Sequence, residues 1–194
     1  FANAFGFEKA FLFGNGFMAN MGIIKALADK QTLIFSDKLN HASLIDGALA
    51  SDGKLIRYPH LDLDCLDRLI RKYNSKAGII TSDMVFSMDG DIADLPKLLE
   101  ISNKYNYPLI LDEAHSAGVL GDNLRLGLVA ELDKSQKQNI ILVCPLGKAF
   151  GAYGAIVLAN GIYKDVIEQF ARTLIYSTSL PQICAKAARL SLEI

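Results

Sequence analysis

The sequence predicts an α/β domain of three layers, in which helices cover both faces of a mostly parallel sheet of about seven strands. Three observations lead to this prediction. Short apolar runs recur along the whole chain. Within each run the apolar residues follow one another without alternating with polar ones. Amphipathic segments lie between several of the runs. A strand that is apolar throughout is typical of a sheet buried on both faces. The alternation of strand and helix implies parallel pairing through right-handed crossovers.

The expected strands are seven apolar runs. They lie at residues 11–13, 33–35, 55–56, 78–80, 109–111, 140–143 and 155–158. Between them, residues 64–73 place Leu66, Leu69 and Ile70 on one face of a helix, and residues 94–105 repeat this pattern with Pro96 just inside the helix start. The charged stretch 131–139 is expected to be a surface loop.

Composition bounds the class of protein. The chain has 194 residues, of which 51% are hydrophobic and 21% charged, and its net charge is −1. This balance is ordinary for a globular domain, and it gives no electrostatic sign of nucleic acid or an anionic membrane as a partner. No apolar run approaches the roughly 20 residues of a membrane helix. The three scattered cysteines predict reduced thiols in a cytoplasmic protein and no metal cluster.

The ends of the chain suggest a part of a longer protein. The chain starts at Phe1 rather than Met, and it stops at Ile194 within an expected helix. We therefore expect residues 1–194 to form one domain of a longer parent.

Polar and ionisable residues follow the apolar runs. They occupy residues 15–17, 37–41, 83–87, 112–115 and 145–148. In open α/β sheets, ligands bind beyond the carboxyl ends of the strands. These segments are therefore expected to meet in one site.

Asp112 and His115 follow the run at 109–111. A carboxylate at the end of a buried strand is costly unless a cation or a hydrogen-bond donor faces it. Asp112 could cap a helix beside a solvated histidine, or it could bind the protonated ring nitrogen of a heterocyclic cofactor. The Asp-x-x-His spacing alone leaves both open.

Lys148 lies in a glycine-rich turn after the run at 140–143. It could be a surface lysine, or a desolvated amine with a lowered pKa that acts as a nucleophile. Gly16 and Phe17 begin a helix after the first run, where free N–H groups suit a phosphate, although a plain tight turn fits as well. The spacing matches neither G-x-G-x-x-G nor the P-loop.

His41 and Ser87 have simple alternatives too. His41 could cap a helix or stack on an aromatic cofactor ring. Ser87 could be a turn residue or a cofactor ligand. The fact that all these residues follow successive runs of one sheet favours the functional interpretation.

Four strings carry a family resemblance. They are Leu-Asn-His-Ala-Ser at 39–43, Val-Phe-Ser-Met-Asp-Gly-Asp at 85–91, Asp-Glu-Ala-His at 112–115 and Leu-Gly-Lys-Ala-Phe-Gly at 146–151. In this order, over essentially the whole chain, the sequence resembles the α-oxoamine synthases, which are fold-type-I pyridoxal phosphate (PLP) enzymes. The resemblance implies the aspartate aminotransferase-like large domain, without the family's N-terminal segment and C-terminal small domain.

The resemblance also implies a reaction. The family joins an amino acid to an acyl-CoA, with loss of CO₂. Residues 170–181 are most similar to the branch that joins L-alanine to a pimeloyl thioester in biotin synthesis. Joining of glycine to acetyl-CoA, or another reaction of the family, is the alternative. A non-catalytic subunit with this fold is a further alternative, but it would have no need of Lys148. A dinucleotide-binding domain is another alternative, but the glycine pattern that such a domain needs is missing from this sequence.

Residue roles follow from the same resemblance. Lys148 would hold PLP as a Schiff base and act as the base. Asp112 would pair with the ring nitrogen, and His41 would stack on the ring.

The remaining implied contacts surround the cofactor's edge. His115 and Ser87 would contact the side of its phenolic oxygen, and Gly16 and Phe17 would face its phosphate. Thr178 would approach the phosphate of a partner subunit, in a homodimer with a shared active site.

One position departs from the family pattern. The family has threonine three positions before the lysine, where its hydroxyl binds phosphate, and this chain has Pro145. A charged hydrogen bond of this kind is worth roughly 1.5–3 kcal/mol, so weaker PLP binding is expected.

Overall fold

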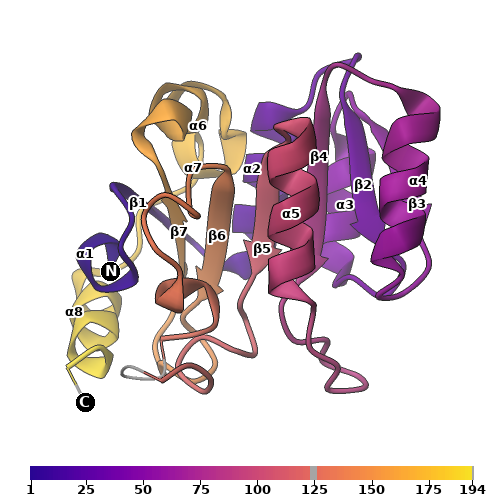
Figure 1. The fold of residues 1–194 in the computed structure, drawn as a ribbon. Coiled ribbons are helices and arrows are strands. Elements are labelled where there is room, and N and C mark those ends of the chain that lie inside the picture. The colour runs from indigo at the N-terminus through magenta and orange to yellow at the C-terminus, as the bar shows by residue number, and fades with distance from the viewer. Residues whose placement is uncertain (123–125, 194) are drawn as a thin grey trace.

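The computed structural model describes residues 1–122 and 126–193 and contains one seven-stranded sheet (Figure 1). Each predicted run forms a strand. The strands are β1 (Lys9–Phe13), β2 (Leu33–Asp37), β3 (Lys54–Tyr58), β4 (Gly78–Asp83), β5 (Leu109–Asp112), β6 (Ile140–Pro145) and β7 (Ala155–Ala159). Their spatial order is β1-β7-β6-β5-β4-β2-β3. The prediction of a mostly parallel sheet of seven strands is confirmed.

Helices fill the connections. They are α1 (Ala2–Phe5), α2 (Gly16–Leu27), α3 (Ala42–Ala50), α4 (Leu63–Tyr73), α5 (Leu95–Tyr105), α6 (Lys164–Phe170), α7 (Arg172–Ile175) and α8 (Gln182–Ser191), with short 3₁₀ turns η1 (Val129–Glu131) and η2 (Gly161–Tyr163). The two predicted helices are α4 and α5, and aspartate side chains cap both starts. Among the described residues, none of these helices combines the length and apolarity that crossing a bilayer requires.

Strand direction brings the strand ends together. β2 to β6 pair in parallel, whereas β7 is antiparallel to both β6 and β1. A turn rather than a helix joins β6 to β7, which explains the reversal. The carboxyl ends of the other six strands therefore meet at one edge of the sheet.

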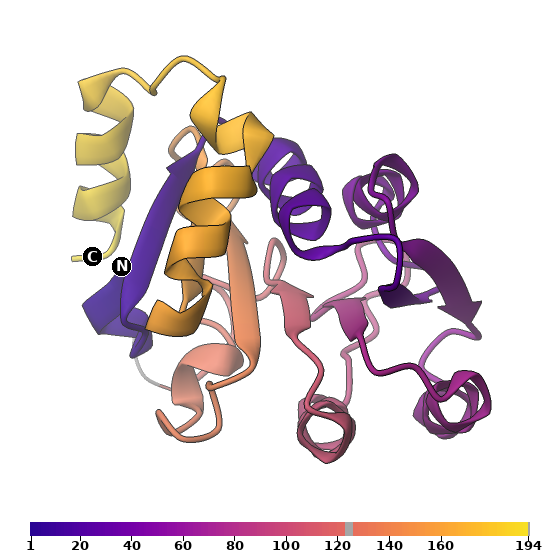
Figure 2. The same cartoon turned by 90° about the horizontal axis from the view of Figure 1, so that it is seen from above.

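Helices cover both faces of the sheet (Figure 2). An apolar core lies between the sheet and the helices on each face. Leu66 of α4 and Leu98 of α5 belong to one core, and Ile23 of α2 and Leu44 of α3 belong to the other. β4, β5 and β7 are buried along their whole length. β1 and β3 alternate between buried and exposed positions, so the expectation of two buried faces is wrong for them. They are the edge strands, each with a neighbour on one side only.

The stretch 131–139 is only partly a surface loop. Lys137 lies within it, and only 2% of the residue is exposed. Its Nζ donates hydrogen bonds to the carbonyl oxygens of Phe5, at 2.8 Å, and Ala130, at 3.0 Å. The surface-loop prediction is therefore wrong at Lys137, because carbonyl oxygens take the place of water around its ammonium group.

Candidate functional site

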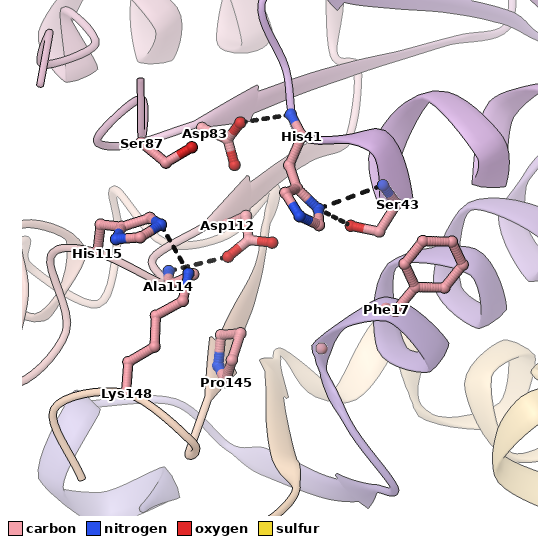
Figure 3. Close-up of a pocket in the computed structure, with 11 residues that line it drawn as sticks. Phe17, His41, Ser43, Asp83, Ser87, Asp112, Ala114, His115, Pro145 and Lys148 are labelled. Carbon is pink, nitrogen blue, oxygen red and sulfur yellow. Dashed lines mark hydrogen bonds between the residues drawn. The ribbon is translucent and has the colours of Figure 1, made fainter. Parts of the chain in front are cut away.

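A pocket of about 180 Å³ opens at the carboxyl edge of the sheet (Figure 3). Its walls come from the starts of α2 and α3 and from the last residues of β4, β5 and β6 with the loops that follow them. The residues that line it are Gly16, Phe17, His41, Ser43, Asp83, Ser87, Asp112, Ala114, His115, Pro145 and Lys148.

The structure brings most of the predicted site residues into this one pocket. They are Gly16, Phe17, His41, Ser87, Asp112, His115 and Lys148. Thr178 is different, because it is exposed in the segment between α7 and α8 and does not line the pocket. The role predicted for Thr178 requires a second subunit.

Asp112 ends β5 and is 4% exposed. Its Oδ2 accepts a hydrogen bond of 2.6 Å from Nδ2 of Asn20, and its Oδ1 accepts one of 2.9 Å from the N–H of Ala114. Burial raises its pKa, whereas these two bonds and the nearby charges of Lys148 and His41 lower it. Among the described residues, no cationic side chain forms an ion pair with it. The pocket therefore presents a buried carboxylate that suits a positively charged donor.

Asp83 is a second buried carboxyl group beside the first. It pairs in register with Asp112 across β4 and β5, and its Oδ2 accepts a 2.7 Å hydrogen bond from the backbone N–H of His41. Burial, and then the charge of Asp112, raise its pKa to about 7. Asp83 is therefore a carboxyl group that can change its protonation state near neutral pH.

Lys148 and His115 are in direct contact in the pocket (Figure 3). Nζ of Lys148 lies 2.7 Å from Nε2 of His115. Burial lowers the pKa of Lys148, although the charges of Asp112 and Asp83 oppose this. Burial, and then the charge of Lys148, lower the pKa of His115. Both groups are thus shifted toward their neutral forms, as a nucleophile or proton carrier requires.

The first turn of α2 forms the opposite wall. Asn15 caps this helix by accepting a hydrogen bond from the N–H of Met18 at 2.9 Å. The N–H groups of Gly16 and Phe17 lie in the first turn, where a helix offers no internal acceptors. A Cβ atom on Gly16 would lie 2.6 Å from Cγ of Pro145. Glycine is therefore required where this helix start meets the end of β6.

Ser87 belongs to a loop that a histidine holds in place. Nδ1 of His60 lies 2.9 Å from Oδ1 of Asp37, and its Nε2 lies 3.1 Å from Oδ2 of Asp91. These contacts join the end of β2 to the loop that carries Ser87, which is itself exposed. The hydrogen bonds to these two aspartates raise the pKa of His60 against the effect of its burial.

The sequence places the segment 83–87 at the site, but it predicts no role for Asp83, Ser43 or Asn20. Asp83 and Ser43 fall within the strings quoted above or next to them, so their position after an apolar run was a usable signal. Asn20 lies in the middle of α2, on the face that buries Ala19 and Ile23. The one feature of the sequence that indicates a role for Asn20 is the presence of an amide on an otherwise apolar helix face.

Among the described residues, no group of three or more histidine, cysteine, aspartate or glutamate side chains is arranged to hold a metal ion. The polar groups that line the pocket are instead one amine, two carboxyl groups, two imidazoles, two hydroxyls and the N–H groups of a helix start. Such a set suits an organic anion that also carries a basic ring nitrogen and a group that reacts with amines.

Comparison with known proteins gives consistent matches. The family model described as aminotransferase class I and II matches residues 2–194. An 8-amino-7-oxononanoate synthase from Marinomonas sp. (strain MWYL1) is 45% identical over 100% of this chain and 47% of that protein. The enzyme of the same name from Nitrosospira multiformis is 46% identical over 97% of this chain and 47% of its own length.

Solved structures of related enzymes superpose on nearly the whole chain. A serine palmitoyltransferase from S. paucimobilis, solved with PLP and myriocin, superposes with a TM-score of 0.91 at 28% identity, over 99% of this chain and 48% of that one. An 8-amino-7-oxononanoate synthase from Francisella tularensis superposes with a TM-score of 0.82 at 40% identity, over 99% of this chain and 55% of that one. The chain thus spans about half the length of the relatives it matches.

Proposed function

The chain belongs to the aminotransferase class I and II family, and on that premise we propose that it is the cofactor-binding domain of a PLP-dependent α-oxoamine synthase. Within that group we propose an 8-amino-7-oxononanoate synthase. The observation that carries the proposal is the meeting of Lys148, His115 and the buried Asp112 in one pocket.

The residues present fit PLP. Asp112 is buried without an ion-pair partner among the described residues, and a protonated ring nitrogen would supply one. The N–H groups of Gly16 and Phe17 would hold the phosphate at the start of α2. Lys148 is the one amine among the residues that line the pocket. Pro145 offers neither a hydroxyl nor an N–H group, so the phosphate would have fewer donors than in the family pattern.

PLP, when bound, reacts with amines and withdraws electrons from the carbon next to the substrate nitrogen. Lys148 would bind the cofactor through Nζ and would later take the proton from that carbon. Asp112 would hold the proton on the ring nitrogen. His115 and Ser87 would donate hydrogen bonds to the phenolic oxygen, and His41 would stack on the ring.

For the substrates, we propose L-alanine and a pimeloyl thioester, carried by CoA or a carrier protein, with release of CO₂. The names of relatives at 45% and 46% identity support this choice. The similarity to serine palmitoyltransferases, at 28% identity, points to the same type of condensation with other substrates. Competition between alanine, glycine and serine in a condensation assay separates these possibilities.

The assembly is also part of the proposal. Residues 1–194 would form the large domain, and Thr178 would reach the phosphate in the partner subunit of a homodimer. The exposure of Thr178, outside the pocket of its own chain, supports this arrangement. The reaction would take place in the cytoplasm.

A labelling experiment tests the function. The protein is mixed with PLP and reduced with borohydride, which fixes the cofactor on the amine that holds it, and the modified peptide is identified by mass spectrometry. We expect the label on Lys148, and its loss in Lys148→Ala. Labelling of an exposed lysine such as Lys186, or of no lysine, would overturn the proposal.

A further inference from the structure

A line of hydrogen-bonded side chains connects Asp112 to His41. Nδ2 of Asn20 lies 2.6 Å from Oδ2 of Asp112 and 2.8 Å from Oγ of Ser43. Oγ of Ser43 lies 2.7 Å from Nδ1 of His41. Asn20 and Ser43 are fully buried, with 0% and 1% exposure, whereas His41 is at the open pocket. The line thus runs from the end of β5, through α2, to the start of α3.

The bonds of Asn20 have a fixed direction. A side-chain amide has two N–H donors on Nδ2, and here one faces the carboxylate of Asp112 and the other faces Ser43. The reversed amide would place Oδ1 against the carboxylate, where two acceptors would repel. Oδ1 is buried and makes no hydrogen bond with the described residues. The amide is therefore oriented by its donors, at a cost in free energy for its oxygen.

The direction continues to His41. Because Oγ of Ser43 accepts from Asn20, its own hydrogen is available to Nδ1 of His41. The backbone N–H of Ser43 also donates to Nδ1, at 3.2 Å. With two donors facing it, Nδ1 keeps its lone pair, and the ring hydrogen lies on Nε2. Figure 3 shows both contacts between the His41 ring and Ser43.

We propose that Asn20 and Ser43 are positioning residues that couple Asp112 to His41. Asn20 orients the carboxylate of Asp112, and Ser43 holds the His41 ring with its hydrogen on Nε2. This proposal rests on the proposed function, because Asp112 would contact the nitrogen of the cofactor ring and His41 would stack on the face of that ring. A purely structural helix would be served as well by an apolar residue at position 20, since its neighbours Ala19 and Ile23 are apolar and buried.

Histidine nitrogen NMR tests the coupling directly, without cofactor. The chain has three histidines, so a ¹⁵N-histidine sample gives a simple spectrum. We expect Nδ1 of His41 to be the nitrogen without hydrogen. Ser43→Ala should shift this resonance. The near-isosteric Asn20→Leu should shift it too, although Asn20 does not touch His41. In the Ser43→Ala background, Asn20→Leu should add no further shift.

The control variant is Ser102→Ala, which removes a buried hydroxyl on α5 that donates to the carbonyl of Tyr107. It should leave the His41 resonance unchanged, and thermal unfolding checks that each variant is folded. Hydrogen on Nδ1 in the unmodified protein would overturn the proposal. So would an Asn20→Leu variant whose His41 resonance equals that of the unmodified protein.

Cofactor binding gives a second measurement. Asn20→Leu should weaken PLP binding by about tenfold or more, because Asp112 loses a hydrogen bond to its charged form. The two proposals can fail separately. If Lys148 is labelled in every variant while the PLP affinity and the His41 resonance stay unchanged, the coupling is wrong and the proposed function stands. Absence of lysine labelling in the unmodified protein would overturn the function, while the NMR result would still decide the coupling.

Discussion

Nζ of Lys148 lies 2.7 Å from Nε2 of His115. An ammonium and an imidazolium can only donate hydrogen bonds, so a contact this short requires that one partner be neutral. The lowered pKa values of both residues agree with this requirement. The two groups are therefore not both charged, and a proton carried by either one has a hydrogen-bonded route to the other.

The first prediction concerns the charge of Lys148. Lys148→Met should raise the pKa of His115, because it removes a positive neighbour that disfavours the imidazolium, while burial continues to lower the value. An NMR titration of ¹⁵N-labelled histidine measures the shift. Lys186→Met, an exposed change on α8, is the matched control. An identical His115 titration in both variants would contradict the pairing.

The second prediction concerns turnover. Under the proposed function, Lys148→Ala should lower the condensation rate by about 10²–10⁴-fold or more, since it would remove both a proton-transfer group and the amine that would hold the cofactor. Amino ketone formation under saturating PLP measures the loss, with Lys186→Ala as the control. Turnover at the unmodified rate in Lys148→Ala would exclude the proposed role.

The strands were predictable because burial dictates their composition. Ile79 and Ile80, or Leu109 to Leu111, stand in strands covered on both sides, so nearly every position is apolar. The sequence does not identify β1 and β3 as edge strands, because their short apolar runs resemble those of the central strands. Their exposure depends on the absence of a neighbouring strand on one side. The burial of Lys137 depends on a carbonyl of Phe5, 132 positions away. No local pattern contains that information.

The site was predictable where chemistry follows a strand. Asp112 and Lys148 each come after an apolar run, and parallel pairing brings such positions together. Asn20 was missed because its role depends on the packing of α2 against the end of β5, 92 positions away. Asp83 begins a segment expected at the site, but its raised pKa was not predictable, because it comes from burial and from Asp112, which only the register of β4 and β5 brings near.

The third prediction concerns stability and pH. The pKa of Asp83 is about 7 in the folded protein, against an ordinary value of 3.8. Between these values the folded protein keeps a proton that the unfolded chain has lost, so the free energy of unfolding should fall as pH rises from about 4 to about 7. Asp83→Asn should reduce this fall by about 1 kcal/mol or more, since one pKa unit corresponds to about 1.4 kcal/mol.

Urea unfolding at pH 5 and pH 8 measures the effect of Asp83→Asn. Glu113 is also buried, with its pKa raised to about 7, so part of the dependence should remain. Asp46→Asn, an exposed change on α3, should leave the dependence as it is. A fall of equal size in Asp83→Asn and the unmodified protein would contradict the assignment.

The fourth prediction concerns Pro145. Pro145→Thr should tighten PLP binding by roughly tenfold or more, because a hydroxyl beside the pocket adds one hydrogen bond to a charged phosphate. Titration of PLP followed by absorbance measures the affinity. A variant that binds no more tightly would show that the phosphate does not approach the end of β6.

The fifth prediction concerns the contact between α2 and β6. Gly16→Ala would place a Cβ atom 2.6 Å from Cγ of Pro145, a separation that atoms cannot keep, so the helix start must move away from the strand end. The N–H groups of Gly16 and Phe17 would move with it, and PLP affinity should fall by about tenfold or more. Gly147→Ala is the matched control, because its Cβ would make an ordinary contact of 3.6 Å with the carbonyl oxygen of Ala152. The double change Gly16→Ala with Pro145→Ala removes Cγ and leaves only the milder contact of 3.2 Å with Cβ, so it should recover part of the affinity. If the double variant binds PLP as weakly as Gly16→Ala alone, the loss does not come from this contact, and the helix start is not placed by Pro145.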